Sequence, residues 1–292
     1  MIKSFSTLAL ISLLILSCDK QEATEIAIIE ETPPPNILFV IADDMGKDAT
    51  PNYSEGQEKP QMPTLEMLAN SGITFDNVWA YPVCSPTRAS IITGKLGYHT
   101  GVLEVEQDIS LSEESLHDFV KSQSNGAYDT ALIGKWHLSN NITDPNNMGI
   151  DYFSGIIGGG VSSYTNWKEV TNGSRTDNTS YTTTAFSSSA IDWISNREKP
   201  WFLWLAFNAP HTPFHLAPAN LHQQGSLPSD DASIAANPLP YYFSAIEALD
   251  KELGRVIAAI PNGLENTIVI FLGDNGTPSQ VIQTPYRLRR AK

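Results

Sequence analysis

The chain has 292 residues, of which 41% are apolar and 17% are charged, a composition typical of a globular protein with one large α/β domain or two small ones. Its net charge of −14 argues against nucleic acid as a partner, and an anionic substrate would need a local positive site. Only two cysteines are present, Cys18 and Cys84, and each has a separate explanation, so we predict no disulfide.

The N-terminus has the pattern of an export signal. Lys3 precedes an apolar run from Leu8 to Leu16, which is too short to span a bilayer. The run ends in a sequence similar to a bacterial lipobox, which predicts removal of residues 1–17 and lipidation of Cys18; ordinary signal cleavage is the alternative. Residues 18–35 are acidic and then proline-rich, as in a tether. We therefore expect an exported lipoprotein, periplasmic or at the cell surface, that meets the membrane only through a lipid anchor at Cys18.

Four continuous apolar runs predict parallel strands that are covered on both faces. They comprise residues 37–42, 130–133, 201–207 and 267–272. Polar residues follow each run, in chain order Asp43-Asp44, Lys135 with His137, Asn208 with His211, and Asp274-Asn275. Because ligands bind outside the carboxyl ends of the strands in such sheets, we expect these side chains to meet at one rim.

Helical patterns occupy the gaps between these strands. The clearest has one apolar face over residues 242–260, another covers residues 63–70 from a starting Pro to a stop near Gly72, and a weaker one covers residues 183–196. A capping box, Ser110-x-x-Glu113, predicts a helix over residues 111–121. This alternation predicts an α/β fold in which helices sandwich a mainly parallel central sheet.

Two polar segments interrupt the alternation. Residues 155–184 are rich in Gly, Ser, Thr and Asn, and Asn172-Gly173 predicts a hairpin turn. Residues 217–240 form a second long polar stretch. Loops of this length are usually functional or mobile, so we expect both segments to shape a substrate mouth; a passive surface insertion is the alternative.

The stretch from Pro82 to Gly94 predicts a helix. Pro86 fits its first turn, Ser85 can cap it and Gly94 can end it. Cys84 would then lie just outside a helix N-terminus that favours an anion, with Arg88 one turn further on and facing the same spot. The plain alternative is a small buried cysteine before an ordinary helix.

Two pairs of polar residues suit a hard cation. Asp43-Asp44 and Asp274-Asn275 supply carboxylate and amide oxygens, which Ca²⁺ and Mg²⁺ prefer. Each pair alone is also compatible with a solvated turn.

The stretch Pro82-Val83-Cys84-Ser85-Pro86-Thr87-Arg88 through Thr93-Gly94 resembles the sulfatase signature, Cys-x-Pro-x-Arg followed by an apolar helical turn and Thr-Gly. The resemblance implies that a formylglycine-generating maturase oxidises Cys84 to formylglycine, and that its hydrate, a gem-diol, attacks the sulfur of a sulfate ester. It also implies one divalent cation, usually calcium, held by Asp43, Asp44, Asp274, Asn275 and the modified Cys84.

The sequence Ala-Leu-Ile-Gly-Lys-Trp-His-Leu, with Lys135 and His137, resembles a second sulfatase signature, although the glycine that usually precedes this strand is displaced. The resemblance implies that Lys135 contacts sulfate and diol, that His137 holds a diol hydroxyl and that Arg88 orients the diol. His211 would protonate the leaving alcohol. Lys292, the last residue, would be a further contact to sulfate.

The resemblance spans residues 36–292. Sulfatases are longer, so it implies a catalytic domain that is incomplete at the C-terminus and lacks a smaller C-terminal subdomain. The implied function is hydrolysis of sulfate monoesters, on a sulfated carbohydrate or an aryl sulfate. The alternatives are a phosphate or phosphonate ester hydrolase of the same alkaline phosphatase superfamily, and an inactive fragment that only binds sulfated glycans.

Overall fold

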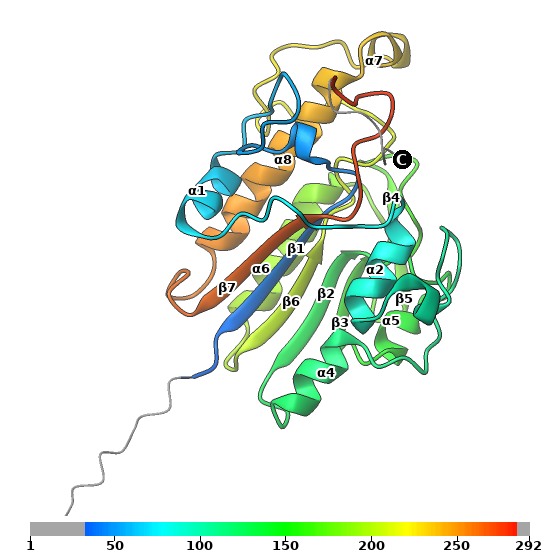
Figure 1. Cartoon of the computed structure of the whole chain (residues 1–292), viewed down its shortest axis with the longest axis vertical. Coiled ribbons are helices and arrows are strands. Elements are labelled where there is room, and N and C mark those ends of the chain that lie inside the picture. Colours follow the sequence, from blue (N-terminus) through cyan, green and yellow to red (C-terminus); the bar gives the residue numbers. More distant parts are fainter. Residues whose placement is uncertain (1–32, 285–292) are drawn as a thin grey trace, which may run out of the picture. The chain divides into compact units, whose positions relative to one another are not determined.

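A computed structural model describes residues 33–284 of the chain (Figure 1). The predicted signal peptide 1–17, the lipidation site Cys18, most of the tether 18–35 and Lys292 therefore lie outside the described residues. Across residues 33–284, no helix combines the length and the apolar character that crossing a bilayer requires.

Seven strands form one sheet within the described residues, in the order β5-β4-β3-β2-β6-β1-β7. In chain order they are β1 (Asn36–Ala42), β2 (Asp129–Lys135), β3 (Tyr152–Ile156), β4 (Trp167–Thr171), β5 (Ser174–Asn178), β6 (Trp201–Ala206) and β7 (Thr267–Gly273). The pairings β3–β2, β2–β6, β6–β1 and β1–β7 are parallel, and the pairings of β4 with β3 and β5 are antiparallel. The predicted mainly parallel sheet is confirmed, and each of the four predicted runs forms one of its parallel strands.

Helices cover both faces of the sheet (Figure 1). They are η1 (Lys47–Ala49), α1 (Pro63–Ser71), α2 (Cys84–Thr93), α3 (Gly97–Thr100), α4 (Leu116–Gln123), α5 (Asp144–Asn147), α6 (Thr182–Ser195), α7 (Asp231–Ala236) and α8 (Leu239–Ala258). Side chains alternate along a strand, so Leu38 and Val40 of β1 pack with α1, α6 and α8, whereas Phe39 and Ile41 pack with α2. The result is the predicted helix–sheet–helix sandwich.

The predicted helix over residues 111–121 is wrong at its start. Helix α4 begins at Leu116, and the Ser115 hydroxyl accepts the hydrogen bond from the backbone N–H of Asp118. Ser110 instead pairs with Ser112, and the Glu113 carboxylate forms an ion pair with Lys95 rather than closing a capping box. A tertiary ion pair therefore overrides the local capping pattern.

The predicted cap of the Cys84 helix is also wrong. Cys84 is the first residue of α2, Val83 is its N-cap, and Ser85 is buried inside the first turn without capping it. Gly94 does end the helix, in a left-handed conformation with φ of 66°. This shift of one residue brings Cys84 onto the helix itself, at its N-terminal end.

The two interrupting segments contain more regular structure than the sequence indicates. Residues 155–184 include the antiparallel pair β4–β5, joined at Asn172-Gly173 as predicted, with φ of 44° and 77°. Residues 217–240, expected to be a loop throughout, contain α7 and the start of α8. The Asp230 carboxylate caps α7 by accepting from the backbone N–H of Ser233.

Candidate active site

The parallel register brings the ends of four strands to one edge of the sheet. Ile41 of β1 lies opposite both Ala206 of β6 and Leu272 of β7, and Gly134 of β2 also lies opposite Ala206. The residues that follow these positions therefore leave the sheet side by side. Two backbone hydrogen bonds hold them there, from Asp43 N–H to the Ala209 carbonyl and from Asp274 N–H to the Ala42 carbonyl.

Gly134 allows β2 to approach β6 closely just before Lys135. Its φ is 111°, and a Cβ atom there would lie 1.9 Å from the Ala206 carbonyl oxygen. A side chain at this position would therefore push the two strands apart. The glycine in the Gly-Lys-Trp-His sequence thus fixes the point at which Lys135 enters the site.

Two cations and two carboxylates alternate at the centre of this rim. Lys135 Nζ lies 2.5 Å from Asp43 Oδ2, and Arg88 donates from Nε and Nη2 to Asp274 Oδ2 at 3.0 and 2.8 Å. All four side chains are 0–1% exposed. Burial opposes the charge of Arg88, but the carboxylates of Asp274 and Asp43 outweigh it and raise its pKa, so Arg88 stays protonated.

Asp44 and Asn275 complete the acidic side of the rim. The Asn275 amide donates from Nδ2 to Asp44 Oδ1 at 2.5 Å, and the Asp44 backbone N–H donates to Asp274 Oδ1 at 3.1 Å. Asp44 has a φ of 65°, in the left-handed region that Asp tolerates better than most residues. Tyr242 of α8 donates to the Asp44 carbonyl at 2.8 Å and so braces this turn.

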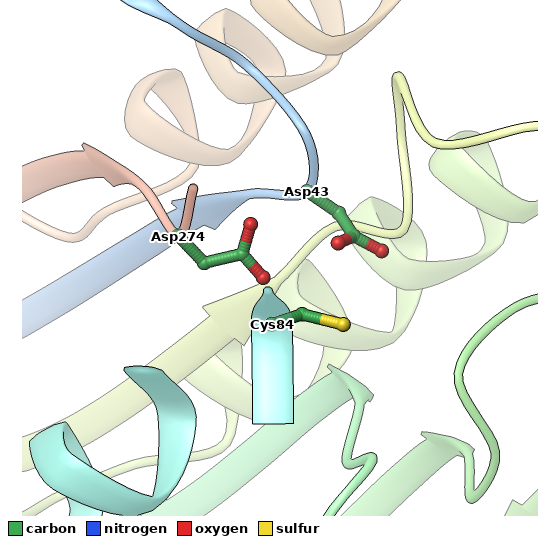
Figure 2. Close-up of side chains that lie close together, drawn as sticks. All are labelled: Asp43, Cys84 and Asp274. Atoms are coloured by element: carbon green, nitrogen blue, oxygen red, sulfur yellow. The ribbon is translucent and has the colours of Figure 1, made fainter. Parts of the chain in front are cut away.

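Cys84 enters the rim from the N-terminal end of α2 (Figure 2). Its Sγ lies 3.1 Å from His137 Nδ1, and Figure 2 shows it beside Asp43 and Asp274. Burial raises the pKa of the Cys84 thiol, an effect that Lys135 only partly offsets. Cys84 as encoded is therefore a neutral thiol and a weak nucleophile, not the activated thiolate of a cysteine enzyme.

The donor set fits a divalent cation. Ligand atoms of Asp43, Cys84 and Asp274 lie within 4.8 Å of one another, as do those of Asp43, Asp44 and His211. Three buried carboxylates outnumber the two buried cations Arg88 and Lys135. Asp43 Oδ1 and Asn275 Oδ1 are buried and accept no hydrogen bond from the described residues. Buried polar atoms normally have a partner, and these two oxygens are of the kind that binds a hard cation.

The pKa of Asp274 also favours a divalent cation at the rim. Burial raises the pKa of its carboxyl, and repulsion from Asp43 adds to this, against the opposing effects of Arg88 and Lys135. A divalent cation would offset both the burial and the repulsion, because it stabilises the ionised forms of nearby carboxylates.

A packed loop after β6 presents His211. The His211 Nδ1–H donates to the Thr212 carbonyl at 2.7 Å, which leaves Nε2 as the atom that faces the rim, 3.7 Å from Asp44 Oδ2. Tyr164 holds the loop by donating to the carbonyls of Asn208 and His211 at 2.9 and 2.6 Å. His215 stacks on Tyr164 at 3.8 Å between ring centroids, and burial lowers the pKa of His215 to about 4, which suits packing rather than proton transfer.

The structure thus brings together nine of the ten predicted site residues: Asp43, Asp44, Cys84, Arg88, Lys135, His137, His211, Asp274 and Asn275. The tenth, Lys292, lies outside the described residues. Sequence reasoning missed Glu106, whose carboxylate lies 3.5 Å from His137 Nε2, as well as Tyr164 and Tyr242. Tyr242 lies on the predicted helix 242–260 and was a visible candidate, but no local pattern marks Glu106 or Tyr164.

The Sulfatase family model matches residues 35–290. The chain belongs to the sulfatase family. The match covers nearly all the described residues and includes every strand that contributes to the rim.

Curated sulfatases are similar to the chain. It is 28% identical to the uncharacterized sulfatase YdeN of Escherichia coli K12, over 94% of the chain and 58% of that protein. It is 28% identical to Arylsulfatase J of Mus musculus, over 89% of the chain and 46% of that protein. It is 33% identical to an N-acetylglucosamine-6-O-sulfatase of Bacteroides thetaiotaomicron over 66% of the chain and 33% of that protein. The chain therefore spans about half the length of the first two relatives.

Solved structures share the fold. Ps i-CgsB superposes with a TM-score of 0.71 at 25% identity, over 86% of the chain and 61% of that structure. BT4656, solved with its substrate D-glucosamine-2-N,6-O-disulfate, superposes with a TM-score of 0.65 at 22% identity, over 83% of the chain and 66% of that structure.

Proposed function

We propose that this sulfatase-family chain carries the catalytic machinery of a hydrolase that cleaves sulfate monoesters of carbohydrates. The observation that supports the proposal is the buried rim, where a cysteine at a helix N-terminus, two cations, two histidines and four carboxylate or amide side chains lie together. Sulfate is an anion, and Arg88 with Lys135 supplies the local positive charge that a chain of net charge −14 needs in order to bind it.

The neutral thiol of Cys84 supports conversion of this residue before catalysis. We propose that a formylglycine-generating maturase oxidises it, and that the hydrated aldehyde supplies the oxygen nucleophile. An unconverted thiol whose pKa is raised by burial lacks that reactivity.

A divalent cation, which we propose to be Ca²⁺, would be held by Asp43, Asp44, Asp274 and Asn275 beside residue 84. When bound it would neutralise charge on a sulfate oxygen and polarise the nucleophile. The all-oxygen donor set of these four side chains favours a hard cation over a softer one.

The side chains around the cation divide the remaining tasks. Lys135 and Arg88 are held rigidly by Asp43 and Asp274, so they can stabilise negative charge as it develops on the sulfate without reorganising. His137 Nδ1 is placed to hold a proton of the hydroxyl at residue 84. His211 Nε2 is placed to protonate the leaving alcohol oxygen, because its other ring nitrogen is occupied by the Thr212 carbonyl.

The relatives favour a sulfated amino sugar or a glycan that contains one. One relative is an N-acetylglucosamine-6-O-sulfatase of Bacteroides thetaiotaomicron, and BT4656 was solved with a disulfated glucosamine as its substrate. Export as a lipoprotein anchored at Cys18 fits this proposal, because it would bring the enzyme to extracellular glycans. Lys292 remains a proposed sulfate contact.

Two measurements on the chain, produced together with a maturase, test the proposal. Mass spectrometry of the Cys84 peptide should show loss of sulfur and gain of an aldehyde. Turnover of 4-nitrophenyl sulfate and of N-acetylglucosamine 6-sulfate should require Cys84, with Cys84→Ala as the inactive control. Conversion of 4-nitrophenyl phosphate in preference to the sulfate would instead support a phosphate ester hydrolase, and binding of the sulfated sugar without turnover would support an inactive fragment.

A further inference from the structure

A second cleft, of about 520 Å³, lies beside the rim. Its walls are the segment that continues from β3, residues 156–162, and the β4–β5 hairpin. Lys168 pairs across the hairpin with Asp177, and Val170 with Arg175, so these side chains share one face, the one that lines the cleft. Ser162 and Asn166 add polar groups at its wall.

Only a glycine segment separates this cleft from the two histidines of the rim. A Cβ atom on Gly159 would lie 2.5–3.1 Å from the imidazole ring of His137, and one on Gly160 would lie 3.3 Å from the ring of His211. Gly158 and Gly160 themselves line the cleft. No side chain projects from Gly158, Gly159 or Gly160, so a sugar whose sulfate ester reaches the rim can extend across this segment toward the cleft.

The charge of the cleft is unusual for this chain. Of the arginines within residues 33–284, Arg88, Arg197 and Arg255 each have a carboxylate partner. The guanidinium of Arg175 has neither a hydrogen bond nor an ion pair with the described residues, and the residue is exposed. Lys168 and Asp177 compensate each other, so the guanidinium of Arg175 leaves the cleft with a net positive charge.

A larger cavity on the opposite side of the sheet provides the contrast. It measures about 920 Å³, lies against α6, and is lined by Asp129, Asp151, Glu169 and Asp192 with Arg197 as its cation. Its net negative charge disfavours an anionic ligand. Of these two cavities, only the cleft that borders the rim has a net positive lining.

We propose that the Arg175 cleft is a subsite for a second sulfate group on the substrate, so that the enzyme prefers sugars sulfated at more than one position. A guanidinium presents paired N–H donors that match the oxygens of sulfate, and an unpartnered one can accept such a group without first breaking an ion pair. This inference rests on the proposed function, because it places the scissile sulfate ester at the rim.

The test compares two sugars that differ by one sulfate, glucosamine 2-N,6-O-disulfate and glucosamine 6-O-sulfate. The quantity measured is the ratio of their kcat/KM values. Arg175→Gln should lower this ratio about tenfold, as expected for loss of a charge-assisted hydrogen bond at a partly exposed site. Arg175→Lys should restore part of it. Lys199→Gln, which removes an exposed positive charge outside the cleft, should leave the ratio unchanged.

The outcomes separate the subsite from the function it rests on. If the wild-type chain turns over these sugars and Arg175→Gln leaves the ratio unchanged, the subsite is excluded and the proposed function stands. If the wild type turns over neither sugar, the proposed function fails for them, and calorimetric binding of the same two sugars decides the subsite. In that case Arg175→Gln should weaken binding of the disulfate about tenfold relative to the monosulfate, and an equal effect on both would overturn the proposal.

Discussion

Two groups of charged side chains, one buried and one exposed, lie on neighbouring parts of the sheet. At the rim, Asp43, Arg88 and Lys135 are 0–1% exposed. On the β4–β5 hairpin, Lys168 and Asp177 are 64% and 69% exposed. Both groups contain close ion pairs, so the distance between the charges does not distinguish them.

The difference in surroundings determines what each group can do. Buried charges lose their hydration and are held in place only because each has a partner, so removing one leaves another uncompensated. Exposed charges keep water, are screened by salt and contribute little to stability. The buried rim is therefore suited to reaction chemistry, which needs fixed charges, and the exposed hairpin to adjustable recognition.

The largest effect should come from the residue at the centre of the buried group. Cys84→Ala removes the thiol group that the proposed conversion to an aldehyde requires, so kcat on 4-nitrophenyl sulfate should fall by about 10⁴-fold or more. Lys199→Gln is a suitable control, because Lys199 is exposed and lies outside both groups. Residual activity within tenfold of the wild type would contradict the assigned role of Cys84.

Removing a buried cation should destabilise the fold far more than removing an exposed partner. Arg88→Leu leaves the Asp274 carboxylate buried without its two hydrogen bonds, so the free energy of unfolding should fall by about 3–5 kcal/mol. Asp177→Asn on the hairpin should change it by less than about 1 kcal/mol. Urea unfolding of both variants measures the contrast. Equal losses in the free energy of unfolding would show that the buried and exposed charges contribute equally to stability.

Calcium should stabilise the folded chain through the buried group of side chains and not through the exposed one. Calcium at about 100 times its dissociation constant should add about 2.7 kcal/mol to stability, and EGTA should remove this increment together with activity. Asp43→Asn should abolish the calcium-dependent rise in melting temperature, whereas Asp177→Asn should retain it. If neither calcium nor EGTA changes the melting temperature of the wild type, the proposed cation at the rim is contradicted.

A buried histidine outside the site should make stability depend on pH. Burial lowers the pKa of His117 to about 3, its Nε2–H donates to the Ala131 carbonyl, and no described residue bonds its Nδ1. Below pH 6.5 His117 binds a proton in the unfolded chain but stays neutral in the folded one. The free energy of unfolding should therefore fall by about 2 kcal/mol between pH 6.5 and 5. His117→Phe should flatten this part of the profile in urea titrations, and an unchanged slope would show that other groups cause it.

The smallest effect should come from the hairpin ion pair. Lys168→Gln should change the free energy of unfolding by less than about 1 kcal/mol, and 1 M salt should remove most of that difference. Thermal unfolding at low and high salt measures it. A loss above 2 kcal/mol that persists in salt would mean that the pair behaves like a buried one.

The sequence predicted the rim well because strand ends are readable. A continuous apolar run predicts a buried strand, and the polar residues after it must leave the sheet at its carboxyl edge, as Asp43, Lys135 and Asp274 do. The resemblance to sulfatases then assigned roles to these residues that spacing alone left open.

Features that depend on contacts distant in sequence were not predictable. The capping box at Ser110 was locally sound, but Glu113 pairs with Lys95, so the helix begins later. Glu106 approaches His137 and Tyr164 braces the His211 loop only once the chain has folded. A role for Arg175 could not be predicted, because one arginine in a polar stretch has no local sequence signal. Only the folded structure shows that its guanidinium lacks a carboxylate partner among the described residues.

The position of β7 has a consequence for heat inactivation. Within the described residues β7 pairs only with β1, and its Ile268 and Ile270 are 48% and 40% exposed. Asp274 and Asn275 follow directly after it, so fraying of this one border strand would withdraw two of the four proposed oxygen ligands while the remaining strands stay paired. On warming, the proposed cation site and the activity that depends on it should be lost several degrees before the helices melt.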